Sequence, residues 1–372
     1  MINADLFRQR VSSLQTAMLA QGVDAFFAST PVNMLYLSGF SEPPLERLMF
    51  LLVPQEGEPV WFVPALSAES TSTNPAGWAV RYVWHDSEGP MKALERCVGE
   101  YPLETGVIAV DDEMPAGFLL MLQEALPTAL FRRGAELVAH VRAVKDATEL
   151  ALMREAARLT DESLSAGLER CMEGYSEWAV ALAIQRALYD AGSRLAFGIP
   201  IVAAGENSSK PHYTTRHRPL QEGDIVVIDF GGVCEGYCSD ITRVVSIGHA
   251  SEEAQKVYQV VYEAHMRARE TAKPGVPAQE VDRAARRVIA EAGYGDYFVH
   301  RTGHGIGLSV HEPPYIVEGN TNLLEEGHCF TIEPGIYLPG KFGIRIENVY
   351  TLTEHGAESL NAEPPTHIRE IF

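Results

Sequence analysis

The chain has 372 residues, 46% of them hydrophobic, and its 50 acidic and 30 basic side chains give a formal charge of −20. This length favours two domains over one compact core, and the negative charge argues against nucleic acid or an anionic membrane as partner. The sequence shows neither the continuous apolar core of a signal peptide nor an apolar run long enough to span a bilayer. Five cysteines without framework spacing predict a reducing, cytoplasmic location.

The first 140 residues predict an α/β domain with a mixed sheet. Apolar residues in the first segment are spaced as one stripe of a helix, and later segments alternate between helical and strand-like patterns. Neither a phosphate-binding loop nor a nucleophile motif is present in this part. In chain order the predicted elements are helix 1–21, strands 24–28 and 34–37, a hairpin of strands 48–53 and 60–63, helix 90–99, strand 107–110, helix 116–126 and strand 129–131.

A domain boundary is expected within residues 141–146, which gives an N-terminal domain of residues 1–143 and a C-terminal domain of residues 144–372. The C-terminal domain repeats the order helix, helix, hairpin, and its glycine stops at Gly174 and Gly275 are 101 residues apart. A duplication of this kind would bring two sheets together about a pseudo-twofold axis, although two common helix stops can also coincide. The four predicted helices cover residues 147–171, 176–191, 252–273 and 278–292.

The first predicted hairpin lies within residues 224–246 and carries one aspartate on each strand. Pairing Asp229 with Asp240 centres this hairpin between Cys234 and Glu235. The two carboxylates then share one face, with Cβ atoms about 5 Å apart. Two like charges so close in a half-buried sheet repel each other unless they share a proton or a cation, and a cation is the simpler explanation.

The second predicted hairpin repeats this construction near the C-terminus. Pairing Glu333 with Glu347 centres it on Gly340. Between the two hairpins lies His304, whose flanking glycines allow close approach of another element. Four carboxylates and one imidazole form a ligand set that suits two divalent ions about 3.5 to 4 Å apart, with an activated water between them.

Four motifs in the C-terminal domain resemble those of one metallopeptidase family, namely VIDFGG…SDITR, HRTGHGIGLSVHE, TIEPGIY and IRIEN. This family includes prolidase, aminopeptidase P and methionine aminopeptidase, and it has the pita-bread fold. The resemblance is strong over residues 147–372 and weaker over the N-terminal domain, which looks like that of the proline-specific members. It implies a fold of the α/β (α+β) class, a mixed-sheet domain followed by a pita-bread domain with an internal pseudo-twofold repeat.

The resemblance also implies a role for each ligand. Asp229 would bind one metal, Asp240 and Glu347 would bridge both, and His304 and Glu333 would complete the second. Mn²⁺ is the expected metal, with Co²⁺ and Zn²⁺ as alternatives, because carboxylate-rich sites favour hard ions. A homodimer is what the family implies.

Three further histidines match family positions, and one aromatic resembles a residue that lines the proline pocket of relatives. His212 and His311 are the candidates for stabilising an oxyanion, and Glu333 is the candidate for moving the proton of the attacking water. His300 is expected to contact substrate. Phe197 is expected in the proline pocket, although a phenylalanine near a strand is as often part of the core.

The resemblance implies hydrolysis of the bond before proline in Xaa-Pro dipeptides by a metal-bridged hydroxide. The substrate is then a small peptide with proline at its second position. One alternative is an aminopeptidase P that acts on longer peptides, and an outside alternative is a metal-free binding module on the same fold. Metal analysis and one turnover assay separate the binding module from both enzymes.

A dipeptidase needs a cation for the free carboxylate of its substrate. Some prolidases carry an arginine four residues after the histidine that corresponds to His311, but this chain has Tyr315 there. Arg47, at the end of the turn-rich loop 38–47, is expected to reach across its own or a partner's cleft and bind this carboxylate beside Tyr315. Arg345 faces the same side of its strand as Glu347, and it binds either substrate or a ligand carboxylate.

Overall fold

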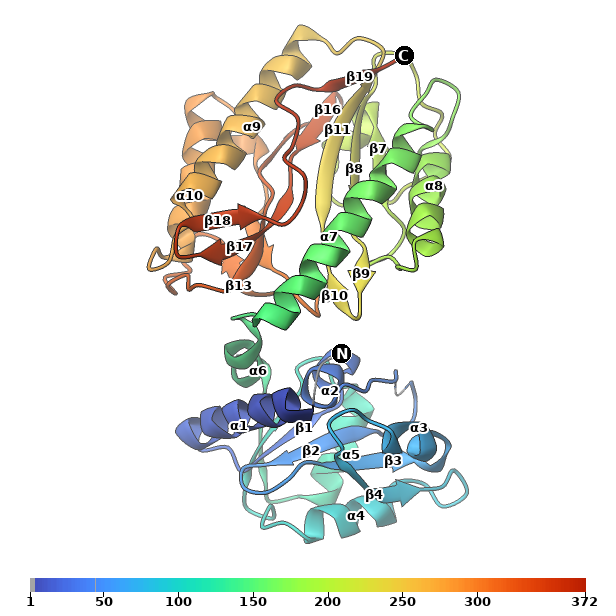
Figure 1. Ribbon diagram of the computed structural model, residues 1–372, viewed down its shortest axis with the longest axis vertical. Helices are drawn as coiled ribbons and strands as arrows, with labels where there is room; N and C mark the ends of the chain where they lie inside the picture. Colours follow the sequence, from blue (N-terminus) through green and yellow to red (C-terminus); the bar gives the residue numbers. More distant parts are fainter. Residues whose placement is uncertain (1–3, 44) are drawn as a thin grey trace. The chain divides into compact units, whose positions relative to one another are not determined.

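The computed structural model describes residues 4–43 and 45–372, which divide into two compact units, Met1–Arg142 and Ala143–Phe372 (Figure 1). The sequence-based division, at 143/144, lies one residue later. Residues 1–3 of the predicted first helix and residue 44 of the loop 38–47 lie outside the described part of the chain. In that part, none of the helices is both long and apolar enough to cross a membrane.

The N-terminal unit is built on a six-stranded mixed sheet of order β4-β3-β2-β1-β5-β6. Strand β1 pairs antiparallel with β2 and parallel with β5. Helices α4 and α5 pack against one face through Leu94 and Phe118, which meet Phe27 and Ile108 in one apolar cluster. The elements are α1 Ala4–Gln21, β1 Ala25–Ala28, α2 Pro31–Ser38, β2 Phe50–Pro54, β3 Val60–Pro64, η1 Ala65–Ser67, α3 Ala68–Ser72, β4 Ala79–Trp84, α4 Met91–Gly99, β5 Val107–Val110, α5 Ala116–Ala125, β6 Leu130–Arg133 and α6 Ala135–Arg142.

The strand predicted at 34–37 is wrong, because these residues belong to helix α2. Thr30 is the N-cap of this helix, and its side chain accepts a hydrogen bond from the backbone N–H of Asn33. Pro31 occupies the first helical turn, where its missing N–H is no loss, so it begins the helix and does not separate two strands. Gly39, with φ of 74°, ends the helix in the left-handed conformation.

The C-terminal unit contains two helix pairs and two main sheets, of orders β19-β11-β8-β7 and β13-β12-β14-β17-β18 (Figure 1). One apolar cluster joins α8 to the first sheet, and a second joins α9 and α10 to the other sheet. The helices are α7 Ala147–Leu168, α8 Glu177–Asp190, α9 Glu252–Thr271 and α10 Ala278–Glu291, with short turns η2 Gly205–Ser209 and η3 Gly295–Tyr297. The strands are β7 Ile201–Ala204, β8 Ile225–Phe230, β9 Val233–Cys234, β10 Tyr237–Cys238, β11 Ile241–Ile247, β12 Gly303–Gly305, β13 Glu312–Ile316, β14 Cys329–Ile332, β15 Gly335–Leu338, β16 Phe342–Arg345, β17 Asn348–Thr353, β18 Gly356–Ser359 and β19 Arg369–Ile371.

The same backbone hydrogen bonds recur in the two halves of this unit. The N–H of Gly174 donates to the carbonyl of Leu220 at 3.1 Å, and the N–H of Gly275 donates to that of Leu324 at 2.8 Å. Both glycines have positive φ, 86° and 82°, where a side chain would be strained. Each half therefore turns from its first helix to its second in the same way and ties that turn to the segment before its central strand, as the predicted repeat requires.

The register of the second hairpin is as predicted. The Cα partners are Ile332 with Asn348 in β14–β17 and Gly335 with Arg345 in β15–β16. These pairs bracket the two glutamates of the hairpin and keep them opposite each other.

The register of the first hairpin differs from the prediction by two residues. Asp229 lies opposite Thr242 and not opposite Asp240. The cause is the turn, because Glu235 and Gly236 both have positive φ, 47° and 92°, and form a two-residue connection one position later than predicted. A shift of two residues preserves the alternation of faces, so both aspartates still point to the same side of the sheet.

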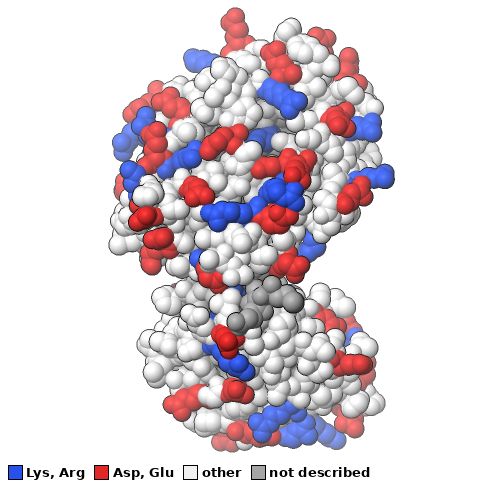
Figure 2. All heavy atoms as spheres, viewed as in Figure 1, with Lys and Arg blue, Asp and Glu red and all other residues white. Residues whose placement is uncertain are grey.

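Close backbone approach in this hairpin requires a glycine. A Cβ atom at Gly231 would lie 1.7 Å from the carbonyl oxygen of Ser239, which directly precedes Asp240 between β10 and β11. On the face that Figure 2 shows, acidic and basic side chains are interspersed on each unit.

Gly231→Ala should lower the free energy of unfolding of the C-terminal unit by about 2 kcal/mol or more, because two strands must separate to admit the methyl group. Urea denaturation measures this. Gly198→Ala is the matched control, since nothing lies within 4 Å of a Cβ atom there. Equal stability of the two variants would contradict the packing described for the hairpin.

Candidate metal centre

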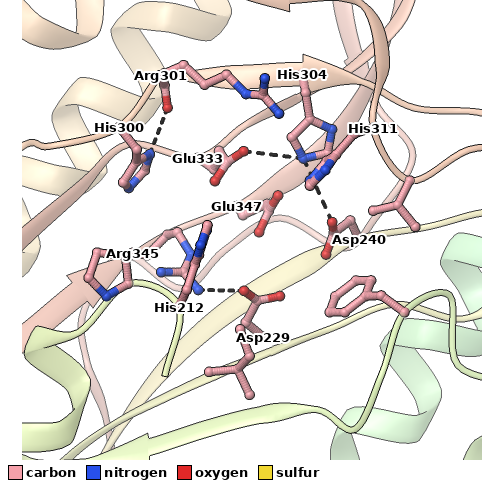
Figure 3. Close-up of a pocket in the computed structure, with 14 residues that line it drawn as sticks. His212, Asp229, Asp240, His300, Arg301, His304, His311, Glu333, Arg345 and Glu347 are labelled. Carbon is pink, nitrogen blue, oxygen red and sulfur yellow. Dashed lines mark hydrogen bonds and ion pairs between the residues drawn. The ribbon is translucent and has the colours of Figure 1, made fainter. Parts of the chain in front are cut away.

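The predicted metal ligands meet in one cavity of about 550 Å³ in the C-terminal unit (Figure 3). The three matched histidines, Phe197 and Arg345 line the same cavity, but Tyr315 and Arg47 are not among its lining residues. The full lining is Phe197, Ile201, Pro211, His212, Asp229, Asp240, His300, Arg301, His304, Val310, His311, Glu333, Arg345 and Glu347.

Three of these side chains already form a compact ligand group. One potential ligand atom from each of Asp240, His304 and Glu347 lies within 4.8 Å of the others. The Nε2 atom of His304 is 4.0 Å from Asp240 Oδ2 and 3.4 Å from Glu333 Oε1. Its Nδ1 atom is 3.1 Å from the carbonyl oxygen of Gly305, a contact in which Nδ1–H donates. This tautomer leaves the Nε2 lone pair facing the carboxylates, as a metal ligand requires.

The carboxylates are held close together away from water. Burial and the charge of Glu347 raise the pKa of Asp240 well above its ordinary value, and burial with the charge of Glu333 does the same for the pKa of Glu347. Burial raises the pKa of Glu333 to about 7. Among the described residues Asp240 Oδ1 is buried and has no hydrogen-bond partner. An unpaired buried carboxylate oxygen beside other carboxylates is costly, so the residues fit divalent cations.

Arg345 fixes one of the ligands. Its NH2 group donates to Asp229 Oδ2 at 2.5 Å, its NH1 group to the Tyr337 hydroxyl at 2.7 Å and its Nε to Thr242 Oγ1 at 3.0 Å. Thr242 in turn donates to Glu347 at 2.6 Å. Of the two roles considered for Arg345 from the sequence, the structure shows the contact with a ligand carboxylate.

Two histidines beside the carboxylates are held neutral at pH 7. His300 Nε2 is 2.8 Å from the Tyr337 hydroxyl and Nδ1 is 2.7 Å from the carbonyl oxygen of Arg301. Burial and the nearby Arg345 lower the pKa of His300 to about 3. The His311 ring stands edge-on to that of His304, with centroids 4.2 Å apart, and partial burial lowers its pKa. A neutral imidazole can donate one hydrogen bond without repelling a bound metal.

A buried ion pair behind the cavity was not predicted from the sequence. Lys145 Nζ lies 2.7 Å from Glu312 Oε1, and their side chains are 1% and 7% exposed. Glu312 also accepts from the backbone N–H of Ser309. These contacts fix the segment that carries His311. The only sequence feature that pointed to this ion pair was the position of Glu312 directly after His311. No pattern in the sequence indicated that Lys145 would contact Glu312.

Two residues that were predicted to bind substrate, Arg47 and Tyr315, do not line the cavity. Arg47 is in the N-terminal unit, where its guanidinium bonds to Asp86 at 3.1 and 3.0 Å and to Glu46 at 2.5 Å. Tyr315 packs against the guanidinium of Arg301, whose CZ atom is 4.5 Å from the ring centroid. The contact of Arg47 with substrate stays a prediction.

The family model for metallopeptidase family M24 matches residues 151–354, and the model for the creatinase/prolidase N-terminal domain matches residues 10–144. The chain belongs to metallopeptidase family M24. It is thus a hydrolase of the peptidase class, and its C-terminal unit is the pita-bread domain expected from the motifs.

Three solved structures are similar to this chain over nearly its whole length. A prolidase from Thermococcus sibiricus is 35% identical with a TM-score of 0.92, covering 98% of this chain and 99% of that one. Dipeptidase PepE from Mycobacterium ulcerans is 37% identical with a TM-score of 0.91, covering 100% and 99%. An X-Pro aminopeptidase from Thermotoga maritima is 32% identical with a TM-score of 0.82, covering 96% and 100%.

Asp240→Asn should have opposite effects on stability with and without metal. In the metal-free protein it removes one of several repelling charges, so the thermal midpoint should stay equal or rise. With Mn²⁺ the wild type should gain about 2.7 kcal/mol at a metal concentration of 100 times Kd, and the variant should lose most of this gain. Thermal unfolding with Mn²⁺ and with chelator measures both.

Asp296→Asn is the control for this experiment, because Asp296 is exposed and outside the cavity. It should keep the wild-type response to metal. An Asp240→Asn protein that responds to Mn²⁺ like the wild type would contradict the assignment of Asp240 as a ligand.

Proposed function

We propose that this M24 peptidase is an Xaa-Pro dipeptidase that works with two divalent metal ions. The observation that carries the proposal is the cavity in which four carboxylates, three of them buried, lie with His304, and in which Asp240 Oδ1 is unpaired among the described residues. The prolidase from Thermococcus sibiricus and the dipeptidase PepE from Mycobacterium ulcerans support the substrate class.

The proposed ligands divide between two ions. Asp229 would hold one ion, Asp240 and Glu347 would bridge both, and His304 and Glu333 would complete the second. Metal ions bound there would polarise the scissile carbonyl and bring the pKa of a bound water towards neutrality.

The other residues of the cavity supply positioning and proton transfer. A peptide bond before proline has no N–H, so a peptidase cannot hold it through that group. Phe197, Ile201 and Val310 line the cavity with apolar surface suited to a proline ring. Glu333 would accept a proton from the attacking water and return it to the proline nitrogen. His311, which lies beside His304 (Figure 3), would donate to the developing oxyanion.

An aminopeptidase that accepts longer peptides is the second candidate function. The X-Pro aminopeptidase from Thermotoga maritima shares the fold at a TM-score of 0.82. Tyr315 also stands where some prolidases carry an arginine. The two candidates share their chemistry and differ in what contacts the carboxyl side of proline. The metal-free binding module considered from the sequence is not supported, because the chain belongs to a peptidase family.

The proposal extends to the metal, the assembly and the location. Mn²⁺ is preferred to Co²⁺ and Zn²⁺, since most of the donors are carboxylate oxygens. A homodimer rests on the resemblance to the family. A cytoplasmic location is supported by the cysteines, since the structure forms no disulfide among them and Cys97, Cys171, Cys238 and Cys329 are buried as free thiols.

Purified protein with Mn²⁺ should hydrolyse Ala-Pro faster than Ala-Pro-Ala, measured as kcat/KM by chromatography of the products. Chelator should abolish both activities, because the carboxylates cannot polarise a carbonyl without a cation. Glu347→Gln and Glu333→Gln should each abolish turnover while the fold survives. Faster cleavage of the tripeptide would identify an aminopeptidase, and undiminished turnover by the Gln variants would refute the metal centre.

His311→Ala should lower kcat by about 10² to 10⁴ with metal content retained, because a donor to the oxyanion is lost while the ligands remain. Steady-state kinetics and metal analysis are read together. His355→Ala, an exposed histidine with its side chain 88% accessible, is the control. Loss of metal in the His311 variant would instead make His311 a ligand.

A further inference from the structure

Arg301 is a cation in the cavity whose guanidinium packs on an aromatic ring and, among the described residues, donates no hydrogen bond. Its side chain lines the cavity and is half-buried, with its guanidinium against the ring of Tyr315 at 4.5 Å. Within residues 4–43 and 45–372 this guanidinium has no hydrogen bond or ion pair. The other arginine that lines the cavity, Arg345, uses Nε and both terminal nitrogens on protein groups. A half-buried guanidinium with unused donors is suited to an anionic ligand.

The position of Arg301 in the cavity suits contact with the proline residue of the substrate, which is the leaving group. In an Xaa-Pro dipeptide the carboxylate carbon is three covalent bonds from the scissile carbonyl carbon, so the two lie within about 4 Å of each other. The cation that binds this carboxylate must therefore line the same cavity as the metal ligands. Arg301 lines one cavity with Glu333, His304 and His311 (Figure 3), so its side chain lies near the reacting centre.

We propose that Arg301 binds the free C-terminal carboxylate of the dipeptide substrate, and that Tyr315 is a positioning residue for its guanidinium. This inference rests on the proposed function and names what selects dipeptides. The ring of Tyr315 attracts the guanidinium through its face, which orients the group and leaves its N–H donors free for two parallel bonds to a carboxylate. Where some prolidases have an arginine, this chain has Tyr315, and in the proposal this tyrosine orients Arg301.

Other cations near the cavity supply the comparison. A neighbouring hollow shares His212 with the cavity and is lined by Lys210, Arg216 and Arg218. Arg218 is held by Asp224 at 2.6 and 2.9 Å, and Lys210 bonds to Asn207 at 3.1 Å. Arg216 is exposed and lies outside the main cavity. It is the control for the loss of one arginine charge, since it lies outside the cavity and is exposed where Arg301 is half-buried.

The experiment compares Ala-Pro with Ala-Pro-amide, which lacks the carboxylate charge, in the Mn²⁺-loaded full chain. Arg301→Met should raise KM for Ala-Pro by about 10- to 100-fold, the loss of one charged hydrogen-bonding partner, and should leave kcat/KM for the amide within about two-fold. Arg301→Lys should recover part of the loss, because it restores the charge without the fork of donors. Arg216→Met should behave as the wild type on both substrates.

Two measurements separate binding from catalysis. L-proline should raise the thermal midpoint of the Mn²⁺-loaded wild type more than L-prolinamide does, and Arg301→Met should abolish this difference. Tyr315→Phe should retain wild-type KM for Ala-Pro, whereas Tyr315→Leu should raise KM and leave kcat unchanged. A fall in kcat on both substrates in the Leu variant would make Tyr315 a merely structural residue.

Equal loss on Ala-Pro and its amide in Arg301→Met would overturn the proposal, since Arg301 would then act through Glu333 or His304. The proposal would also be overturned if Arg216→Met or Arg47→Ala lost the preference for dipeptides while Arg301→Met kept it. The substrate carboxylate would then bind at a residue other than Arg301. If the wild type cleaved no Xaa-Pro substrate, the proposed function would fail, while the comparison of proline with prolinamide would still decide whether Arg301 binds a carboxylate.

Discussion

The crowding of four carboxylates in one cavity, three of them buried, is the constraint on which the rest of the C-terminal unit depends. Burial raises the pKa of Asp240 and that of Glu347 well above their ordinary values, and repulsion by the neighbouring carboxylates raises both further. Arg345 offsets part of the repulsion through its contact with Asp229. The repulsion that remains favours binding of cations. The same crowded carboxylates therefore constrain the fold and account for the expected metal ions.

The scaffold holds these charges by placing two similar halves face to face. Each half brings a helix pair and a sheet, and their apolar clusters keep the central strands rigid. The strands that carry the ligands approach unusually closely, since a Cβ atom at Gly303 would lie 1.9 Å from the carbonyl oxygen of Thr331. This contact sets the depth of the neighbouring His304. Strands β8 and β12 therefore position Asp229 and His304, whereas Asp240, Glu333 and Glu347 lie directly beside the ends of β11, β14 and β17.

Much of this centre was predictable because alternation along a strand is a local property. The pairing of Glu333 with Glu347 followed from a turn at Gly340, and even a register error of two residues left Asp229 and Asp240 on one face. Contacts between distant segments were not predictable. The Lys145–Glu312 pair spans 167 positions, and no local pattern distinguishes such a lysine from a solvated one.

The cations around the cavity have different roles, and this division follows from their partners. Arg345 donates to Asp229, Tyr337 and Thr242, whereas we propose that Arg301 donates to substrate. The most direct measurement of the central claim is anomalous diffraction from crystals grown with Mn²⁺. The account predicts two peaks about 3.5 to 4 Å apart among the carboxylates and His304. A cavity without an anomalous peak in Mn²⁺-saturated, active enzyme would contradict it.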